Sequence, residues 1–310
     1  MSQPPAACVA ILLSTFDGER YLNEQLRSFL AQSHPNWVLY WRDDGSSDST
    51  PRMMDAFAAG PGTGRCIRVA TPGRLGATES FLALLRVALT GPADYFAFSD
   101  QDDVWLPTKL ANGVAALSGP EKPGPGLFYC PRALVDASLR PSGTVPPPRK
   151  PPGFPAALTQ NVIPGCCMIL NRPAARQIEA MGVPERTWHD WWSYLVVAAS
   201  DGNIVRGRTA DILYRQHAGN LVGETAGFWH RTTRAIRRGR GPFMTLFRAH
   251  VTTLRARQDL LPETSRAVLA VVAQGCEGGF IPRLKALCLP GFTRQTWAET
   301  LIFRLWFLLG

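Results

Sequence analysis

Hydrophobic and polar positions alternate with two different periods in the first hundred residues. Residues 19–32, 50–59 and 77–89 space their apolar side chains at helical intervals. Asp48 or Ser49 can cap the second of these helices, and Pro51 is tolerated in its first turn. Short apolar runs of strand length separate the helices, at residues 8–14, 37–42, 66–70 and 95–99. The alternation predicts an α/β fold with a parallel sheet that helices cover on both faces.

Two acidic segments follow the second and the fourth predicted strand. Residues 43–48 read DDGSSD, and residues 99–105 read SDQDDVW. Ligands of open parallel sheets bind beyond the carboxyl ends of the strands, so we expect both segments and the Ser14–Thr15 turn at one site. The alternatives are an ordinary turn with a helix cap for residues 43–48 and a solvated acidic loop for residues 100–103.

The second segment crowds Asp100, Asp102 and Asp103 into four residues. Neighbouring carboxylates repel one another and raise one another's pKa, so a group that stays ionised usually needs a cation beside it. Mg²⁺ or Mn²⁺ is held by one or two carboxylates, completed by water and substrate phosphates. The segment therefore predicts a divalent cation that bridges a diphosphate.

Composition limits the classes of protein to consider. The 310 residues are 45% hydrophobic, which excludes a disordered chain and fits one large domain or a domain with an appendage. Seven cysteines form no Cys-x-x-Cys pair, so neither a zinc site nor a disulfide framework is indicated. The first residues lack the features of a signal peptide or a spanning helix, and we expect a cytoplasmic protein.

A formal net charge of +9 indicates an anionic partner, and the excess is local. Residues 225–258 contain no Asp or Glu, and Phe228, Trp229, Phe243 and Phe247 lie among the basic positions. Basic amphipathic helices of this kind bind anionic membrane surfaces, with the aromatic side chains inserted. Helices that simply pack on the rest of the protein are the alternative, and nucleic acid is not expected because no recognisable binding module accompanies the charge. The arginines in this segment are Arg231, Arg234, Arg237, Arg238, Arg240, Arg248, Arg255 and Arg257.

Six short motifs occur in an order that resembles the inverting glycosyltransferases of family 2, specifically bacterial rhamnosyltransferase-like members. The resemblance covers about Val9 to Gly223. The motifs are VAILLSTFDGERYLNEQLRSFLAQ, DDGSSDST, SDQDDVWLPTKL, NVIPGCCM, HDWW and YRQHAGNLVG.

The resemblance implies the GT-A fold, a Rossmann-like sheet that binds a nucleotide sugar. We expect residues 1–223 to form this domain, with the Pro-rich residues 141–155 as a mobile surface loop. Residues 224–310 are then a basic, mostly helical extension that either associates with a membrane or packs on the catalytic domain.

By the same resemblance, Thr15 and Phe16 would contact the nucleoside, and Asp44 would accept a hydrogen bond from the pyrimidine N3–H. Asp102 stands in the Asp-x-Asp position of the family, and Asp102 and His217 would hold Mg²⁺ or Mn²⁺. Asp100 would serve the ribose or the outer shell of the metal. The full set of residues assigned to the nucleotide and donor is Ser14, Thr15, Phe16, Asp44, Asp100 and Asp103.

An inverting transfer needs one carboxylate to take a proton from the acceptor hydroxyl. Asp190 in the WHDWW motif fits this role, although a carboxylate at a helix N-terminus can also be only a cap. His189 replaces a Glu found in many relatives, which makes a role for this neighbour doubtful. Gly165 and Trp191 are expected on the acceptor side.

The sequence therefore predicts a metal-dependent hexosyltransferase that moves a sugar, L-rhamnose from dTDP-rhamnose, to a hydroxyl of a cell-surface polysaccharide or lipid-linked glycan. It would work at the inner face of the cell membrane as a peripheral protein. A sugar-nucleotide nucleotidyltransferase is an alternative, but STFDGER is not the Gly-rich basic loop it would need. A non-enzymatic membrane or nucleic-acid adaptor would not need Asp44, Asp102, Asp190 and His217 together. The donor sugar and the acceptor rest on the resemblance alone, and the linkage and oligomeric state do not follow from the sequence.

Overall fold

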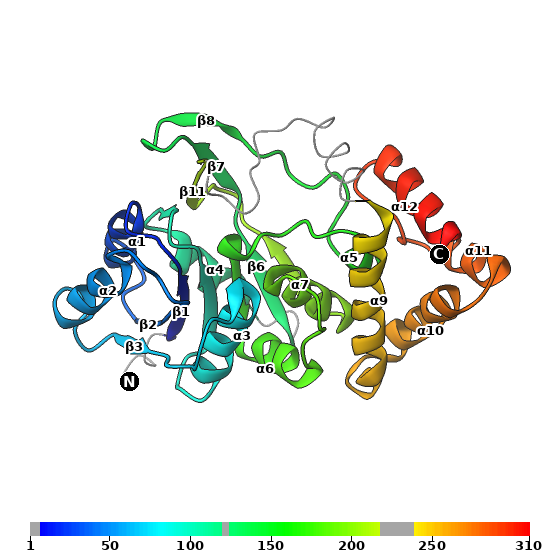
Figure 1. The fold of residues 1–310 in the computed structure, drawn as a ribbon, viewed down its shortest axis with the longest axis horizontal. Helices are drawn as coiled ribbons and strands as arrows, with labels where there is room; N and C mark the ends of the chain where they lie inside the picture. Colours follow the sequence, from blue (N-terminus) through cyan, green and yellow to red (C-terminus); the bar gives the residue numbers. More distant parts are fainter. Residues whose placement is uncertain (1–6, 120–123, 218–238) are drawn as a thin grey trace. The chain divides into compact units, whose positions relative to one another are not determined.

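A computed structural model describes residues 7–119, 124–217 and 239–310 of the chain. The chain divides into two compact units (Figure 1). The first unit comprises Met1–Pro146, Pro164–Arg176 and Val205–His217, and the second comprises Pro147–Ile163, Gln177–Ile204 and Ala218–Gly310.

The first unit holds most of the strands. Its elements in chain order are β1 (Val9–Thr15), α1 (Leu22–Leu30), β2 (Trp37–Asp43), α2 (Thr50–Ala59), β3 (Cys66–Arg68), α3 (Gly76–Leu89), β4 (Tyr95–Ser99), β5 (Val104–Trp105), α4 (Lys109–Leu117), β6 (Gly126–Tyr129), β7 (Arg132–Val135), β8 (Pro141–Thr144), the 3-10 helix η1 (Gly165–Cys167), β9 (Met168–Asn171) and β11 (Ile212–Arg215). Helix α6 (Arg172–Met181) and strand β10 (Asn203–Arg206) each contain residues of both units.

The central sheet has seven strands in the order β10-β6-β9-β4-β1-β2-β3. Strands β4, β1, β2 and β3 are mutually parallel, and β9 is antiparallel to both β4 and β6. All five residues of β4 are buried, as are Val9 to Leu13 of β1. Central parallel strands are apolar on both sides because other layers cover both faces. The α/β prediction is confirmed, and the antiparallel strands are an addition that the sequence pattern did not indicate.

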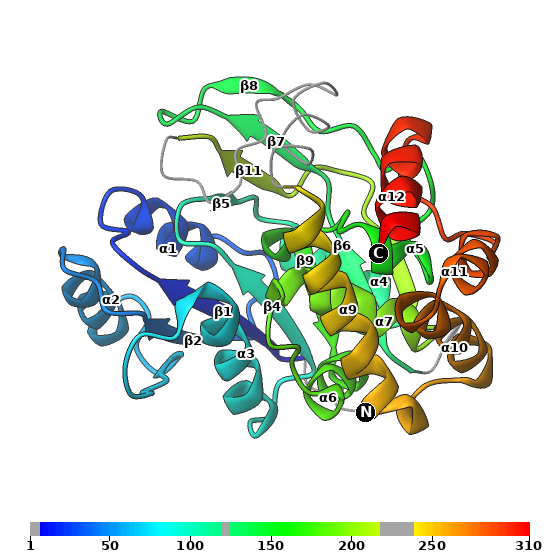
Figure 2. The same cartoon turned by 45° about the vertical axis from the view of Figure 1, so that its right-hand side comes forward.

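A smaller sheet of four strands has the order β5-β11-β7-β8 (Figure 2). Its edge strand β8 is formed by the start of the Pro-rich segment, with all four residues exposed. Proline donates no hydrogen bond, so it is tolerated at a sheet edge and not in a central strand. This sheet brings β11 beside β5, which directly follows the acidic segment at residues 100–103.

The described part of the second unit is helical. Its elements are α5 (Ala156–Thr159), α7 (His189–Ala199), α9 (Arg240–Ala256), the 3-10 helix η2 (Gln258–Leu260), α10 (Glu263–Glu277), α11 (Phe280–Leu287) and α12 (Trp297–Leu309). Phe247, Phe292, Phe303 and Phe307 form a buried aromatic cluster that joins α9 to α12. Among the helices in these ranges, none combines the length and apolar character needed to cross a bilayer.

The mostly helical character predicted for the C-terminal part is confirmed. The predicted domain boundary at residues 223 and 224, and the residues Phe228, Trp229, Arg231, Arg234, Arg237 and Arg238, lie outside the described residues.

Candidate active site

Strands β1, β2 and β4 end at the same edge of the central sheet because they are parallel and in register. Thr15 is paired with Asp43, and Leu13 is paired with Ser99. The segments that follow these three strands therefore meet, as the sequence predicted. The half-buried Ser14 lies beside Arg42 in the same register.

The turn after β1 is tied to both neighbouring loops. Thr15 donates through Oγ1 to Oδ1 of Asp43 at 2.9 Å. The backbone N–H of Phe16 donates to Oε1 of Gln101 at 2.9 Å, and Nε2 of Gln101 donates back to the Phe16 carbonyl at 2.8 Å. A Cβ atom on Gly18 would lie 2.3 Å from Oε1 of Gln101, so a larger residue there would displace the Gln101 amide from Phe16. The reciprocal pair holds the two loops against each other.

The ring of Phe16 is exposed at the edge of the sheet. Its exposed fraction is 36%, and the Arg74 guanidinium carbon lies 3.9 Å from the ring centroid. An exposed aromatic ring with a stacked cation is a suitable surface for a planar base, because bases stack on aromatic and guanidinium faces.

Asp43 and Asp48 serve the turn between β2 and α2. Both oxygens of Asp43 are occupied, with Oδ2 accepting from the backbone N–H groups of Gly45 and Ser46. Asp48 accepts from the N–H of Thr50 at 2.9 Å at the start of α2. Asp43 and Asp48 therefore match the alternative given for residues 43–48, an ordinary turn with a helix cap and not a ligand site.

Asp44 differs from its neighbours because it is buried and ionised. It is 4% exposed and accepts hydrogen bonds from Nη1 of Arg42 at 2.5 Å and from the N–H groups of Leu75 and Gly76 at 2.7 and 2.8 Å. Burial opposes ionisation, but these three donors outweigh it and lower the pKa of Asp44 below its usual value. A carboxylate has about four acceptor positions, so one remains for a ligand donor such as a pyrimidine N3–H.

Arg42 is a buried residue beside the candidate site, and the sequence analysis did not predict its position. It is 1% exposed and donates to Asp44, Thr71, Ser80 and the Gly73 carbonyl. It thereby fixes the loop before α3 against the end of β2. An arginine at the end of an otherwise apolar strand was the available signal, because a buried guanidinium requires partners.

Asp102 and His217 lie together, 115 residues apart in the chain. Nε2 of His217 is 2.8 Å from Oδ2 of Asp102, and the two side chains are 16% and 21% exposed. The His217 ring also contacts the ring of Tyr21, with centroids 4.7 Å apart. The structure thus brings together the two residues that the sequence analysis assigned to the metal, and their role remains a prediction.

Arg215 joins the acidic loop to β11. Its Nε donates to the Asp102 carbonyl at 2.8 Å, and its backbone N–H donates to Oδ1 of Asp103 at 3.1 Å. The guanidinium also pairs with Glu24 of α1 and lies over the Tyr21 ring. The fully buried Arg215 therefore sets the position of Asp102. His217 comes two residues after Arg215, just beyond the end of β11.

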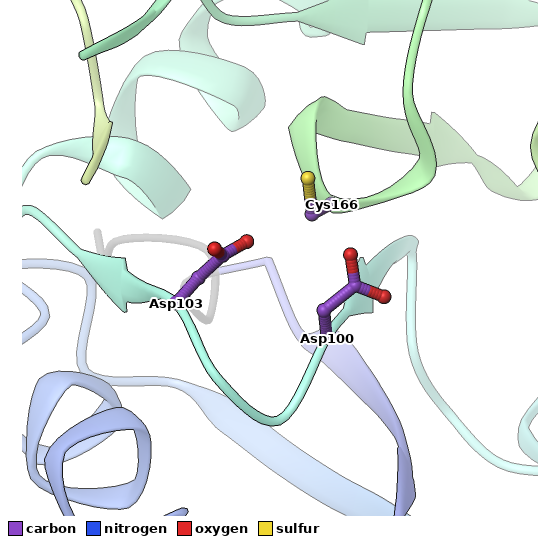
Figure 3. A group of neighbouring side chains, drawn as sticks. All are labelled: Asp100, Asp103 and Cys166. Atoms are coloured by element: carbon purple, nitrogen blue, oxygen red, sulfur yellow. The ribbon is translucent and has the colours of Figure 1, made fainter. Parts of the chain in front are cut away.

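Asp103 is inside the fold and not at the surface of the site. It is 1% exposed, and burial together with the charges of Asp102 and Asp100 raises its pKa well above the usual value. An oxygen of Asp103, an oxygen of Asp100 and the sulfur of Cys166 lie within 4.8 Å of one another (Figure 3). A hydrogen bond with Cys167 and burial raise the pKa of the Cys166 thiol as well. The group does not include Asp102 and His217, the two residues predicted to hold the metal.

Lys109 stabilises the 3-10 helix η1, which contains Gly165, through a hydrogen bond. The Lys109 side chain is fully buried, donates to the Cys166 carbonyl at 2.6 Å and lies 3.3 Å from the Trp105 ring centroid. Burial lowers the pKa of this lysine. The sequence around Lys109 gave no indication of this role.

Asp190 and Trp191 belong to the second unit, at the start of α7. Oδ1 of Asp190 accepts from the Trp191 N–H at 2.6 Å, and the Trp191 indole donates to the Ala157 carbonyl at 2.7 Å. His189 is buried, and burial lowers its pKa to about 3, so the imidazole is neutral at ordinary pH. The neutral imidazole therefore cannot supply the negative charge of the Glu that, by the resemblance, His189 replaces.

Residues 10–178, more than half of the chain, match the model of the family described as Glycosyl transferase family 2. The chain belongs to glycosyl transferase family 2. It is therefore a glycosyltransferase, and the edge of the central sheet is its candidate active site.

Two relatives extend the similarity of this transferase beyond the family region. The dTDP-rhamnosyl transferase RfbG of Shigella flexneri is 25% identical over 228 residues, which cover 70% of this chain and 75% of that protein. An uncharacterized protein of Mycobacterium tuberculosis is 27% identical over 313 residues, which cover 94% of this chain and 84% of that protein.

Among solved structures, residues 1–349 of S. aureus TarS in complex with UDP match the transferase with a TM-score of 0.56 at 14% identity. The match covers 86% of this chain and 70% of that chain. Together with the seven-stranded sheet, this likeness confirms the predicted GT-A fold.

The chemistry of the Asp102–His217 pair fits a divalent cation in this family 2 transferase. A carboxylate oxygen and an imidazole nitrogen are both ligands that Mn²⁺ accepts, while Mg²⁺ prefers oxygen alone. Both side chains are partly exposed, so substrate phosphates and water can complete the coordination. The buried Asp103 and Cys166 lack this access.

Proposed function

We propose that this glycosyltransferase binds a nucleoside diphosphate sugar at the carboxyl edge of β1, β2 and β4 and transfers the sugar with inversion. The observation that carries the proposal is the Asp102–His217 pair, which stands at that edge beside the turn of Thr15 and Phe16. Solved structures of S. aureus TarS in complex with UDP and with UDP-GlcNAc support a donor of this class.

In this proposal the base and ribose lie on the β1 and β2 side of the edge. Ser14, Thr15 and Phe16 contact the nucleoside, with the Phe16 ring and Arg74 as the stacking surface. Asp44 accepts the pyrimidine N3–H in its remaining acceptor position. Arg42 acts through Asp44 as a positioning residue.

The diphosphate lies on the β4 side, where Asp102 and His217 would hold Mg²⁺ or Mn²⁺. When bound, the cation would neutralise the charge of the departing diphosphate. Asp100 binds the ribose or lies in the outer shell of the cation. Asp103, which was expected at the donor, contributes from inside the fold by holding β11 against the acidic loop.

Asp190 is proposed as the general base that takes the proton from the acceptor hydroxyl. Its position in the first turn of α7 and its contact with the Trp191 N–H support an ionised carboxylate, because helix N-termini favour negative charge. Gly165 and Trp191 are proposed on the acceptor side.

For the donor sugar we propose L-rhamnose from dTDP-rhamnose, and for the acceptor a hydroxyl of a surface polysaccharide or lipid-linked glycan at the inner face of the membrane. The similarity to the dTDP-rhamnosyl transferase RfbG supports this choice of donor. Residues 1–223 would be the catalytic domain and residues 224–310 the extension that meets the membrane.

A thermal-shift screen tests the donor. Ligands that bind the folded state raise the unfolding temperature by mass action. We expect dTDP and dTDP-rhamnose to stabilise the protein in the presence of Mn²⁺ and to do so much less in its absence. Stabilisation by UDP or GDP sugars alone would contradict the rhamnose donor, and stabilisation by no nucleotide would contradict the proposed function.

A further inference from the structure

Exposed apolar side chains are concentrated on two helices at the end of the second unit. Of the thirteen large apolar side chains that are exposed among the described residues, seven lie in α11 and α12. These seven expose 46–78% of their surface, and the other six expose 36–43%. The seven are Phe280, Ile281, Leu284, Trp297, Leu301, Leu305 and Leu309.

The exposed residues of α12 follow one stripe because they recur at every fourth position, at Trp297, Leu301, Leu305 and Leu309. The opposite side of the same helix is buried through Phe303 and Phe307 in the aromatic cluster. A helix that is apolar on all sides is normally buried entirely. Helix α12 has one side packed and one side open, so its outer side lacks a partner among the described residues.

Helix α11 continues the apolar surface. The two helices pack against each other (Figure 2). Arg283 donates to the Leu308 carbonyl at 2.8 Å. Between them lies an open groove of about 680 Å³, lined mainly by leucines that include Leu284, Leu301 and Leu305. The stripe and the groove together form the surface that we name the α11–α12 face, defined by the seven exposed residues above.

Charge indicates what covers this face. Residues 278–310 contain Arg283, Lys285, Arg294 and Arg304 but a single acidic residue, Glu299. Lys285 and Arg304 are exposed, and Arg304 lines the groove. Glu299 is occupied by the capping box with Thr296 at the start of α12. A face with apolar side chains bordered by exposed cations complements an anionic lipid surface.

A second copy of the chain is a poorer complement. In a two-fold symmetric dimer the same patch meets itself, so the exposed cations would face the same cations of the partner. Glu299, the acidic residue of this stretch, is already held by Thr296 and cannot neutralise both sides.

We propose that the α11–α12 face docks on an anionic bilayer, with the apolar stripe in the headgroup region and Lys285 and Arg304 at the phosphates. This proposal assigns a surface to the membrane association proposed above. All of the residues that carry it belong to the second unit. It also corrects one sequence expectation, because Phe247 was expected to insert into the membrane and is instead fully buried in the aromatic cluster. The alternation of apolar and basic residues in α9 reflects packing of that helix on α10, α5 and α12, with Arg248 exposed.

Co-sedimentation of the full-length protein with vesicles tests the proposal. The probes are vesicles of phosphatidylcholine with roughly one-third phosphatidylglycerol, and vesicles of phosphatidylcholine alone. We expect binding to the anionic vesicles that is only partly released by salt, because salt screens the cations and leaves the apolar insertion. Replacing two stripe residues, Leu301→Gln with Leu305→Gln, should weaken this binding at least about tenfold.

A matched control adds polar bulk and charge to another helix of the same unit. Thr264 and Gln274 are exposed on α10, and Thr264→Glu with Gln274→Glu should leave vesicle binding within about twofold of the original. A thermal melt confirms that both double variants are folded. Full binding by the folded stripe variant would overturn the proposal, and so would a protein that ignores anionic vesicles at low salt.

Two further readouts separate the possible outcomes. Sedimentation velocity would reveal a dimer that the stripe variant abolishes, which would assign the face to a second copy and overturn the lipid proposal. Nucleotide-induced thermal stabilisation, measured in the stripe variant, should be unchanged because α11 and α12 hold none of the proposed donor residues. Loss of vesicle binding with intact nucleotide binding thus supports the docking face independently of the donor.

Discussion

Nε2 of His217 lies 2.8 Å from Oδ2 of Asp102, at the edge of the sheet where the parallel strands end. The two residues flank different strands of the smaller sheet, since Asp102 precedes β5 and His217 follows β11. Strands β5 and β11 are antiparallel neighbours, so the end of one meets the start of the other. Arg215 locks this arrangement through the Asp102 carbonyl.

Removal of Arg42 should destabilise the protein strongly. Arg42→Ala would leave the buried Asp44 carboxylate without its guanidinium partner, and breaking a buried ion pair costs about 3–5 kcal/mol in the free energy of unfolding. The control is Arg68→Ala, because Arg68 pairs with Asp55 at 3.5 Å with both side chains more than half exposed. That surface pair should contribute less than about 1 kcal/mol. Urea denaturation measures both changes, and equal losses would contradict the role of Arg42.

Stability should fall as the pH is lowered, because of two buried histidines. Burial lowers the pKa of His189 and of His250 to about 3, whereas a histidine in the unfolded chain titrates near 6.5. Between these values the unfolded chain binds more protons, so the free energy of unfolding decreases toward acid. Each histidine contributes up to about 1.4 kcal/mol per pH unit.

Urea denaturation between pH 7 and about pH 5 checks this dependence. His250→Gln should reduce the slope of the unfolding free energy against pH, because one of the two titrating groups is removed. The Thr187 hydroxyl, 2.8 Å from Nε2 of His250, can bond to a glutamine in its place. An unaltered slope in the folded variant would argue against a depressed pKa for His250.

Asp190→Asn should reduce turnover by a factor of about 10²–10⁴ with little change in donor affinity, because a general base acts in the transition state. Asp259→Asn is the control, since Asp259 is an exposed aspartate of the same unit. Turnover is measured by release of the nucleoside diphosphate in the presence of an acceptor, and donor affinity by calorimetry. Turnover equal to that of the Asp259 variant would remove Asp190 from the mechanism.

The strands and helices of the first hundred residues were predictable because their apolar periods are regular. Strand β4 and helix α2 occupy the expected residues, and the meeting of three strand ends at one edge follows from parallel pairing. The smaller sheet was not predictable, since β5 is two residues long and β8 consists of exposed residues that include a proline. Such strands depend on their partners and have no apolar period of their own.

Only part of the candidate site was predictable, because the sequence shows which residues cluster along the chain but not which of them are buried. Carboxylates in sequence clusters are visible, but their burial is not, so Asp103 and Asp102 look alike in the sequence although one is inside the fold. Arg42, Arg215 and Lys109 are buried cations whose partners lie far away in the chain. Only the tertiary structure reveals that these residues hold the loops of the site.

Calorimetric titration with dTDP in the presence and absence of Mn²⁺ tests the central proposal most directly. The protein should bind the nucleotide in a Mn²⁺-dependent manner, and Asp102→Asn should abolish that dependence because a neutral amide holds a hard dication poorly. Asp55→Asn, the same change at an exposed position of the same unit, should bind as the original protein does. Undiminished Mn²⁺-dependent binding by a folded Asp102→Asn variant would contradict a metal-assisted donor site at Asp102 and His217.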